Sequence, residues 1–382
     1  MKTCWAVVGA VAAVGGTLAG LGLVIARTLT APAGGRTYDL TVRGVEKSRE
    51  RTIVVLDRTD HTDASGIYCL ILENGGWVRL SEGMVDRGIG LIGRVVEDLS
   101  GELRAGDRAS WSGIFFSTPA EAGLAAMDVW VPTDVGPAPA WLIYPQAGPS
   151  MTWAIHIHGL GSPRTGTLRG VQVAAEAGLT SLVVTYRNDG EGPTVGTGRS
   201  ALGAAEADDV RAAVRCAREN GARNVILFGW SMGAAIALQL AQDPELRAIV
   251  KGLVLESPVL DWVSTIKANC ARVGLPEWTG AFALPWLNCW PLARMTGLPR
   301  RVPLRRFDWI ARSDELTTPT LILHGTLDTS SLFEVASELN KRRPDIVELE
   351  AFSADHTMSW NSDPVRWRAA LKARLLMWEE TI

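Results

Sequence analysis

The chain has 382 residues, of which 47% are hydrophobic and 21% are charged. This composition is typical of a globular protein rather than a disordered one, and the length allows one large domain with smaller additions. The formal net charge of −3 provides no basic footprint for nucleic acid, so we expect no nucleic-acid partner.

The first feature along the chain is an uncharged, apolar segment from Cys4 to Ala26. A helix of this length reaches about 35 Å, enough to cross the hydrocarbon core of a bilayer. Because secretory signal peptides have shorter apolar regions, we predict an uncleaved transmembrane anchor over residues 1–27. Cleavage at Ala31-Pro32-Ala33 is the alternative. Gly16 and Gly20 have the GxxxG spacing of packed helices, but chance explains this pair in so glycine-rich a segment.

Cationic residues do not decide the orientation of this anchor, because Lys2 precedes it and Arg27, Arg36 and Arg43 follow it. An apolar, uncharged segment close to the amino terminus is typical of an export signal. We therefore expect a single-pass protein of the cell membrane with the rest of the chain outside the cytoplasm. In that compartment Cys270 and Cys289 can form a disulfide, while the lack of a CxxC pair argues against a structural zinc site.

Residues 28–126 contain short runs in which apolar and polar residues alternate, separated by turns rich in Gly, Asp and Ser. Thr52–Leu56 and Ile67–Leu72 are examples. Such alternation is typical of strands, so we predict a small β-rich accessory module. The module contains no cluster of catalytic residue types, and we expect a spacer or a packing cap rather than a ligand-binding unit.

Residues 127–382 alternate strand-like and helical stretches, which predicts an α/β domain with a doubly wound, mostly parallel sheet. Residues 259–306 interrupt this alternation. This insertion is broken by prolines and rich in tryptophan, and we expect a lid whose tryptophans give the functional site an apolar roof: Trp262, Trp278, Trp286 and Trp290.

The pentapeptide Gly229–Gly233, GWSMG, follows the apolar run Asn224–Phe228 and precedes the small-residue stretch Ala234–Leu240. A strand, a sharp turn and a helix in this order are typical of a nucleophile elbow, which exposes a serine hydroxyl in a strained turn. Side chains at the two glycines would crowd the strand against the helix. We therefore predict that Ser231 is a nucleophile; the alternative is an ordinary glycine-bounded turn.

A serine nucleophile needs a base and an acid. His356, in the loop after the strand-like run Val347–Ala351, is our predicted base. Asp328 follows the apolar run Thr320–Gly325, so it would lie at the carboxyl end of a strand, where the sites of open α/β sheets gather. It is our predicted acid. Two other carboxylates are alternatives, one after an earlier strand and one beside the histidine: Asp261 and Asp355.

Acyl transfer also needs backbone N–H groups that bind the developing oxyanion. The glycine turn His158–Gly161 follows a strand, and we predict that the N–H groups of Leu160 and Met232 form the oxyanion hole. We expect His158 to hold its loop through hydrogen bonds, and we expect two other histidines on buried strands to belong to the core: His156 and His324.

Residues from about 127 to 380 resemble the α/β-hydrolase superfamily, in the branch with serine aminopeptidase-like, acylaminoacyl-peptidase-like and lysophospholipase-like enzymes. The order Ser231, Asp328, His356 matches the order in that superfamily. The resemblance implies the α/β-hydrolase fold and an acyl-enzyme that needs no metal or organic cofactor, but it does not imply a substrate. The matching segments are HGLGS at 158–162, TYRND at 185–189, GWSMG at 229–233, LILHGTLD at 321–328 and ADHTMSWN at 354–361.

These features together predict a membrane-anchored serine hydrolase that cleaves a small-molecule ester or amide, in particular a carboxylesterase for apolar acyl groups. A peptidase or an acyltransferase of the same fold are the enzymatic alternatives. A non-catalytic member of the fold that binds a ligand or partner is the third. An apolar lid would favour esters of medium chain length over acetate, because each buried methylene contributes about 0.8 kcal/mol.

Overall fold

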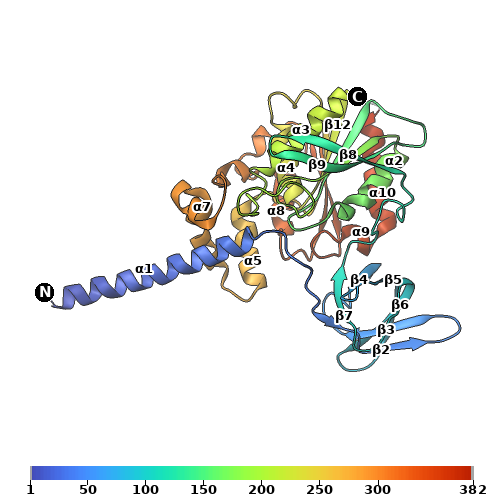
Figure 1. Ribbon diagram of the computed structural model, residues 1–382, viewed down its shortest axis with the longest axis horizontal. Helices are drawn as coiled ribbons and strands as arrows, with labels where there is room; N and C mark the ends of the chain where they lie inside the picture. The colour runs from blue at the N-terminus through green and yellow to red at the C-terminus, as the bar shows by residue number, and fades with distance from the viewer. Residues whose placement is uncertain (1, 380–382) are drawn as a thin grey trace.

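A computed structural model describes the backbone of residues 2–379 and the side chains of residues 16–378. In this part of the chain there are two β-sheets, one formed by residues 40–112 and one by residues 126–352. Figure 1 shows them in separate parts of the molecule, with the long helix α1 (Lys2–Leu29) projecting from the larger part.

The smaller sheet is antiparallel and has the strand order β1-β7-β4-β5-β6-β3-β2. Alternate residues of its strands face one core, where Val54, Leu70 and Leu80 are fully buried. We call this unit the β-module; it lies inside the range 28–126 that the sequence assigns to an accessory module. Its strands are β1 (Leu40–Thr41), β2 (Gly44–Lys47), β3 (Thr52–Asp57), β4 (Tyr68–Leu72), β5 (Trp77–Asp86), β6 (Leu91–Ser100) and β7 (Arg108–Ser112).

The larger sheet has eight strands in the order β15-β14-β13-β12-β10-β11-β9-β8. Strands β8, β9 and β11 pair antiparallel, and the remaining pairs are parallel, so the predicted mostly parallel sheet is confirmed. The strands are β8 (Ala126–Thr133), β9 (Gly136–Ile143), β10 (Thr152–Ile157), β11 (Thr180–Val184), β12 (Asn224–Trp230), β13 (Val250–Glu256), β14 (Thr320–Gly325) and β15 (Val347–Phe352).

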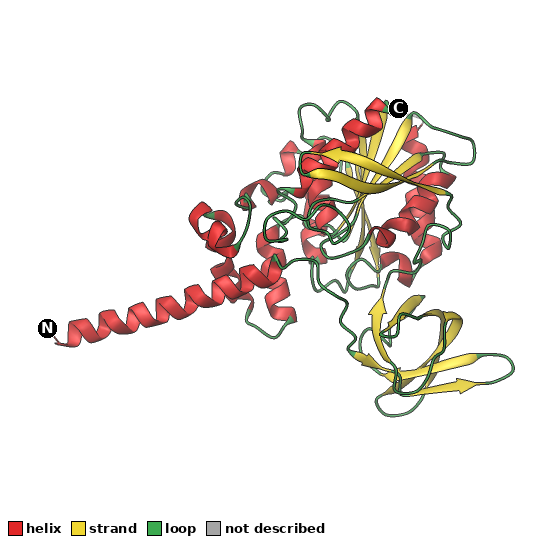
Figure 2. Ribbon diagram, in the orientation of Figure 1, coloured by secondary structure: helices red, strands yellow, loops and turns green. Residues whose placement is uncertain are grey.

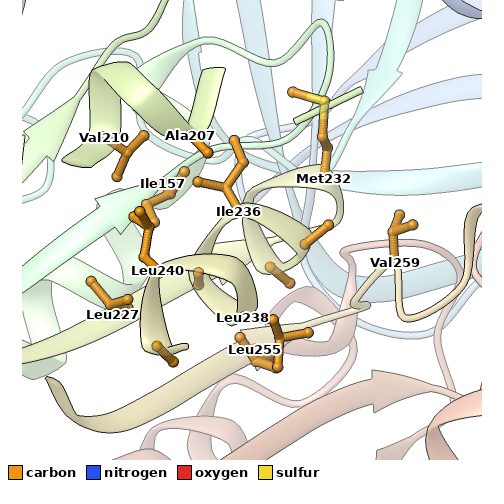
Figure 3. Packing of buried hydrophobic residues seen from close by; sticks show 14 of the residues in the cluster. Ile157, Ala207, Val210, Leu227, Met232, Ile236, Leu238, Leu240, Leu255 and Val259 are labelled. Carbon is orange, nitrogen blue, oxygen red and sulfur yellow. The ribbon is translucent and has the colours of Figure 1, made fainter. Parts of the chain in front are cut away.

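Helices cover both faces of this sheet (Figure 2), because its central strands are apolar on both sides. One core contains side chains of α3 and α4 against the strands; in Figure 3 Ile236 and Leu240 of α4 lie near Ile157 and Leu227. A second core lies under α2 and α10. The helices are α2 (Leu168–Glu176), α3 (Glu206–Glu219), α4 (Met232–Ala241), α8 (Phe333–Arg342), α9 (Ser359–Ser362) and α10 (Pro364–Glu379).

Between β13 and β14 the chain forms a helical insertion, which coincides with the predicted lid at 259–306. Cys270 is buried in it and Cys289 is exposed, and both are free thiols, so the possible disulfide between them is not formed. Its helices are α5 (Trp262–Arg272), α6 (Leu284–Asn288) and α7 (Trp290–Thr296), with short 3-10 turns at Glu277–Ala283 and Leu304–Phe307.

The first part of the predicted membrane span Cys4–Ala26, residues 4–15, lies outside the residues whose side chains are described. Among the described residues, no helix is both long and apolar enough to cross a bilayer. The carboxyl end of α1 packs against the helical insertion, where Ala26 is fully buried. A Cβ atom added at Gly22 would overlap the carbonyl oxygen of Phe282, whereas Gly16 and Gly20 have no other atom within 4 Å of such a Cβ. Gly22, and not the GxxxG pair, is therefore the glycine that allows close helix packing.

We expect Gly22→Ala to release the end of α1 from the insertion, because the new methyl group cannot fit against backbone. Gly20→Ala is the matched control. It should leave the packing intact and favour the helix by up to about 1 kcal/mol. Trypsin cleavage after the exposed Arg27 measures the release in detergent solution, and it should be several-fold faster for Gly22→Ala only. Equal cleavage rates for the two variants would contradict this packing.

Candidate active site

The chain turns sharply at Ser231, between the end of β12 and the start of α4. Ser231 has φ 52° and ψ −113°, a backbone conformation that is strained for a residue with a side chain. A Cβ at Gly229 would lie 2.5 Å from the backbone nitrogen of Ala234, and one at Gly233 would overlap the carbonyl oxygen of Ile157 in β10. Only glycine fits at these two positions, which explains why the pentapeptide begins and ends with glycine.

Of the three side chains that the sequence singled out, His356 lies between the other two and contacts both. His356 Nε2 is 2.9 Å from Ser231 Oγ, and His356 Nδ1 is 2.7 Å from Asp328 Oδ2. Ser231 follows β12, Asp328 follows β14, and His356 follows β15. All three therefore stand at the carboxyl edge of the parallel sheet, where loops from neighbouring strands meet.

Asp328 is 5% exposed and accepts several hydrogen bonds. Oδ2 accepts from the imidazoles of His356 and His324, and Oδ1 accepts from the backbone N–H groups of Ser330 and Ser331. Burial by itself raises the pKa of Asp328, but the hydrogen bonds from His324 and His356 outweigh it and hold this pKa well below its ordinary value. The ionised carboxylate keeps a proton on Nδ1 of His356 and leaves Nε2 free to accept one from Ser231.

His324 is a partner of the site that the sequence analysis assigned to the core. Its Nε2 is 3.1 Å from Asp328 Oδ2 and 2.8 Å from the carbonyl oxygen of Ser331. Because a carbonyl oxygen only accepts, Nε2 carries the proton and also donates to the carboxylate. The spacing of four residues between His324 and Asp328, in the His-Gly-x-x-Asp turn, is the sequence signal that points to this contact.

The two alternative acids have other partners. Asp261 caps the first turn of α5, where it accepts from the backbone N–H groups of Val263 and Ser264 at 2.9 and 2.8 Å. Asp355 lies 3.8 Å from His61 of the β-module. Among the described residues, Asp328 is the carboxylate that is hydrogen-bonded to His356.

The predicted oxyanion-hole residues lie on either side of Ser231. Met232 begins α4, so its N–H has no acceptor within the helix. Leu160 lines the cavity at Ser231, and the preceding Gly159 is so close that an added Cβ would lie 3.2 Å from the Cβ of Ser231. Neither N–H has a backbone acceptor within the described part of the chain. Both are therefore available to bind an oxyanion.

Hydrogen bonds of buried groups hold this glycine turn. His158 is 1% exposed, and its Nε2 is 3.0 Å from Asp189 Oδ2. The ring of Tyr186 stacks on that of His158 at 4.4 Å, and its hydroxyl donates to the carbonyl oxygen of Gly159 at 3.0 Å. These contacts fit the loop-holding role expected for His158.

His156 lies apart from these groups, in the core beneath them, where it contacts Ser181 and the ring of Phe228. Burial lowers its pKa to about 3. In the unfolded chain an imidazole titrates near pH 6.5. Between these pH values the unfolded state binds a proton that the folded state excludes, so stability falls as pH falls, by up to about 1.4 kcal/mol per pH unit.

We therefore expect His156→Gln to weaken the loss of stability between pH 6.5 and pH 4, because glutamine does not titrate and can still bond to Ser181. Urea unfolding at several pH values measures this slope. His61→Gln, on an exposed loop, is the control. An unchanged slope in His156→Gln would show that other groups cause the acid sensitivity.

A cavity of about 210 Å³ opens beside Ser231 and His356. Its apolar walls come from the β-module and the following linker, from β12 and from the loop after His356: Trp111, Ile114, Trp230 and Met358. The sequence predicted an apolar roof formed by tryptophans of the insertion. This prediction is wrong, because none of these tryptophans lines the cavity: Trp262, Trp278, Trp286 and Trp290.

The tryptophans of the insertion have other environments. Trp262 is 2% exposed and donates to the carbonyl oxygen of Leu202 in the core. Trp286 faces α1 at Gly22. Trp278 and Trp290 are largely exposed. Trp262 and Trp286 therefore pack against the body of the domain and α1, and none of the four tryptophans of the insertion lines the cavity at Ser231.

A larger groove of about 1430 Å³ runs between the β-module, the insertion and the loops after β14 and β15, and it shares Trp111 and Met358 with the cavity. Besides Asp328, its lining contains more carboxylates than cations. The carboxylates are Asp60, Asp63, Glu277, Glu334, Asp355 and Asp363, and the cations are Arg272 and Arg366, with His61. Among the described residues no group of three or more potential ligands is placed to hold a metal ion.

Comparison with known proteins agrees with this architecture. A model of the alpha/beta hydrolase family matches residues 154–380, and a model of a domain of unknown function (DUF8805) matches residues 41–112. No curated protein sequence gives a significant match.

Two solved structures were compared with this chain in three dimensions. The esterase Pf2001 from Pyrococcus furiosus is 20% identical, with a TM-score of 0.54 over 69% of this chain and 95% of that one. Est1E from Butyrivibrio proteoclasticus is 19% identical, with a TM-score of 0.49 over 66% of this chain and 99% of that one. The likeness to the Pyrococcus furiosus protein shows a shared fold.

Proposed function

The chain belongs to the alpha/beta hydrolase family, and on this basis we propose that it is an esterase-like serine hydrolase that forms an acyl-enzyme at Ser231. The observation that carries the proposal is the position of the His356 ring, 2.9 Å from the serine hydroxyl on one side and 2.7 Å from the Asp328 carboxylate on the other. A serine is activated by this arrangement of base and acid.

In the proposed reaction, Ser231 Oγ attacks the acyl carbon while His356 Nε2 takes its proton. Asp328 stabilises the imidazolium, and the N–H groups of Leu160 and Met232 bind the oxyanion. His356 then returns the proton to the leaving alcohol or amine. Water, deprotonated by the same imidazole, hydrolyses the acyl-enzyme and restores the serine.

We assign the acyl group of the substrate to the cavity beside Ser231. Its walls are mainly apolar and its volume of about 210 Å³ is below the usual range for drug-sized ligands, which suits a short or medium aliphatic chain. Each methylene that leaves water contributes about 0.8 kcal/mol, so kcat/KM should rise about fourfold per carbon until the cavity is full.

Labelling with a fluorophosphonate, followed by kinetics on p-nitrophenyl esters from acetate to decanoate, tests this proposal. We expect labelling of the protein and an optimum above acetate. An absence of labelling under conditions in which the protein is folded would reject the acyl-enzyme. A profile that is flat or falling from acetate to octanoate would reject the apolar acyl substrate.

The acidic groove favours a second candidate, a peptidase whose substrates carry a free amino group. Carboxylates beside the site would attract an ammonium group, which a simple ester does not have. Release of p-nitroaniline from aminoacyl anilides distinguishes the two candidates. A kcat/KM for an anilide above that for every ester of the series would favour the peptidase.

We also propose that α1 anchors the protein in the cell membrane with the hydrolase domain outside the cytoplasm. The uncharged segment Cys4–Ala26 and the continuity of the helix from Lys2 to Leu29 support the anchor. A variant lacking residues 2–20 should move from the carbonate-washed membrane fraction to the soluble fraction. Protease shaving of intact cells should digest the full-length protein; protection from the protease would reverse the orientation.

A further inference from the structure

The β-module reaches the cavity at Ser231. Its last strand, β7, points toward the larger part of the molecule (Figure 1). Trp111 and Ser112 at the end of β7, with Gly113 and Ile114 of the following linker, line the cavity together with Ser231 and His356. Residues that precede the catalytic domain, at the end of the β-module and in its linker, thus line the space that the substrate would occupy.

The end of this strand is held against the loop that carries His356. A Cβ at Gly113 would lie 3.1 Å from Met358 Cγ and 3.0 Å from Asn361 Oδ1, so the backbone of the linker lies directly against these two side chains. The carbonyl oxygen of Gly113 accepts from Asn361 Nδ2 at 3.0 Å and from Arg169 Nη1 at 3.2 Å. Arg169, which is 5% exposed, also donates to the carbonyl oxygen of Thr357, beside His356.

A second part of the β-module makes the same kind of contact. The N–H of Ile67 donates to the carbonyl oxygen of Asn361, and Asn361 Nδ2 donates to the carbonyl oxygen of Ile67, both at 2.9 Å. Asn361 is fully buried, so these hydrogen bonds are shielded from water. Ile67 of the β-module and Gly113 of the linker are therefore both fixed on Asn361 of α9, the short helix that follows the His356 loop.

Within the β-module, a buried arginine supports the residues that face the cavity. Arg94 is fully buried, donates to the carbonyl oxygens of Ala64 and Gly66, and lies over the ring of Trp111 at 5.6 Å. The rings of Trp111 and Tyr68 are 4.6 Å apart. Trp111 thus packs against Arg94 and Tyr68 within the β-module, and it can act as a fixed wall.

From this placement we propose that the β-module and its linker form a specificity element, in which Trp111 of the module and Ile114 of the linker form the wall that limits the length of the acyl chain. This inference rests on the proposed serine hydrolase function and gives a role to a domain of unknown function. Ile114 Cδ1 would lie 3.8 Å from a Cβ at Gly166, another lining residue, so its side chain spans much of the space between the linker and the catalytic domain. The size of the side chain at position 114 therefore determines the cavity volume that remains for the acyl chain.

Two substitutions at Ile114 test this wall in opposite directions. Ile114→Phe fills the cavity. Each methylene that the cavity no longer admits should lower kcat/KM about fourfold. The ratio of kcat/KM for p-nitrophenyl hexanoate to that for acetate should therefore fall about tenfold. Ile114→Ala enlarges the cavity and should move the optimum of the ester series to a longer chain. Ile89→Ala, at a fully exposed position of the same module, is the matched control and should leave the profile unchanged.

Profiles of both variants within twofold of the wild type, with unchanged thermal unfolding, would overturn the proposal. If Ile114→Phe does not fold, the ester profile of Ile114→Ala is sufficient to test the proposal: a shift of the optimum toward longer esters supports it, and an unchanged optimum rejects it. If the wild type labels with fluorophosphonate but cleaves only aminoacyl anilides, the esterase function fails. The same variants are then compared on alanine, leucine and phenylalanine anilides, where a changed selectivity supports the wall and an unchanged one rejects it.

Discussion

Replacing Ser231 by alanine is expected to abolish fluorophosphonate labelling and to lower ester turnover by about 10⁴-fold or more, because no acyl-enzyme can form. The elbow conformation should survive, since alanine keeps the Cβ atom and the strain at φ 52° is carried by the backbone. Turnover of the best ester substrate and gel-based labelling, measured on the same preparation, check both parts of the result.

Ser117→Ala serves as the control, because Ser117 lies on an exposed linker. It should keep full labelling and turnover. Labelling of Ser231→Ala at the wild-type rate would show that another residue is the nucleophile. A loss of labelling together with a large drop in the unfolding temperature would mean that the substitution disrupts the fold at this turn, so that the loss could not be assigned to the missing hydroxyl.

Asp328→Asn is expected to lower kcat by about 10³- to 10⁴-fold. The amide is uncharged, and if its oxygen accepts from the two imidazoles at the Oδ2 position, its NH2 group faces the N–H donors of Ser330 and Ser331. His356 then loses the partner that keeps its proton on Nδ1, and the imidazolium formed in the reaction is no longer stabilised. Steady-state kinetics on the best ester measures the loss.

Asp261→Asn is the matched control for the acid. It changes a helix cap, which is worth about 1 kcal/mol of stability, and asparagine is itself a good cap. Its kcat should remain within a few-fold of the wild type. A larger loss in Asp261→Asn than in Asp328→Asn would place the acid after the earlier strand.

Much of the catalytic domain is predictable from the sequence because the relevant signals are local. Gly229 and Gly233 flank Ser231 in one turn, and each is needed because a neighbouring element is closer than a side chain allows. Asp328 and His356 each follow an apolar strand, and in a parallel sheet the carboxyl ends of strands meet at one edge. The fold of the domain, and the meeting of these three residues, follow from rules that act within a few residues of each motif.

The environment of the site depends instead on contacts between distant residues. The side chain of Asn361 binds the backbone at Gly113 and Ile67, which no spacing along the chain indicates. For the same reason the sequence alone suggested a spacer or a packing cap where the β-module also lines the cavity, and a tryptophan roof where the insertion packs on α1.

The sequence by itself thus determined the α/β-hydrolase fold and the candidate nucleophile, base and acid, since a strained turn and the ends of strands leave local signatures. Only the tertiary structure decided which residues surround them. Trp111, Ile114 and His324 have side chains that fit an ordinary core as well as a binding site, and their roles follow from which surfaces the folded chain brings together. Apolar side chains carry no partner-specific pattern, because the burial that stabilises them is non-directional.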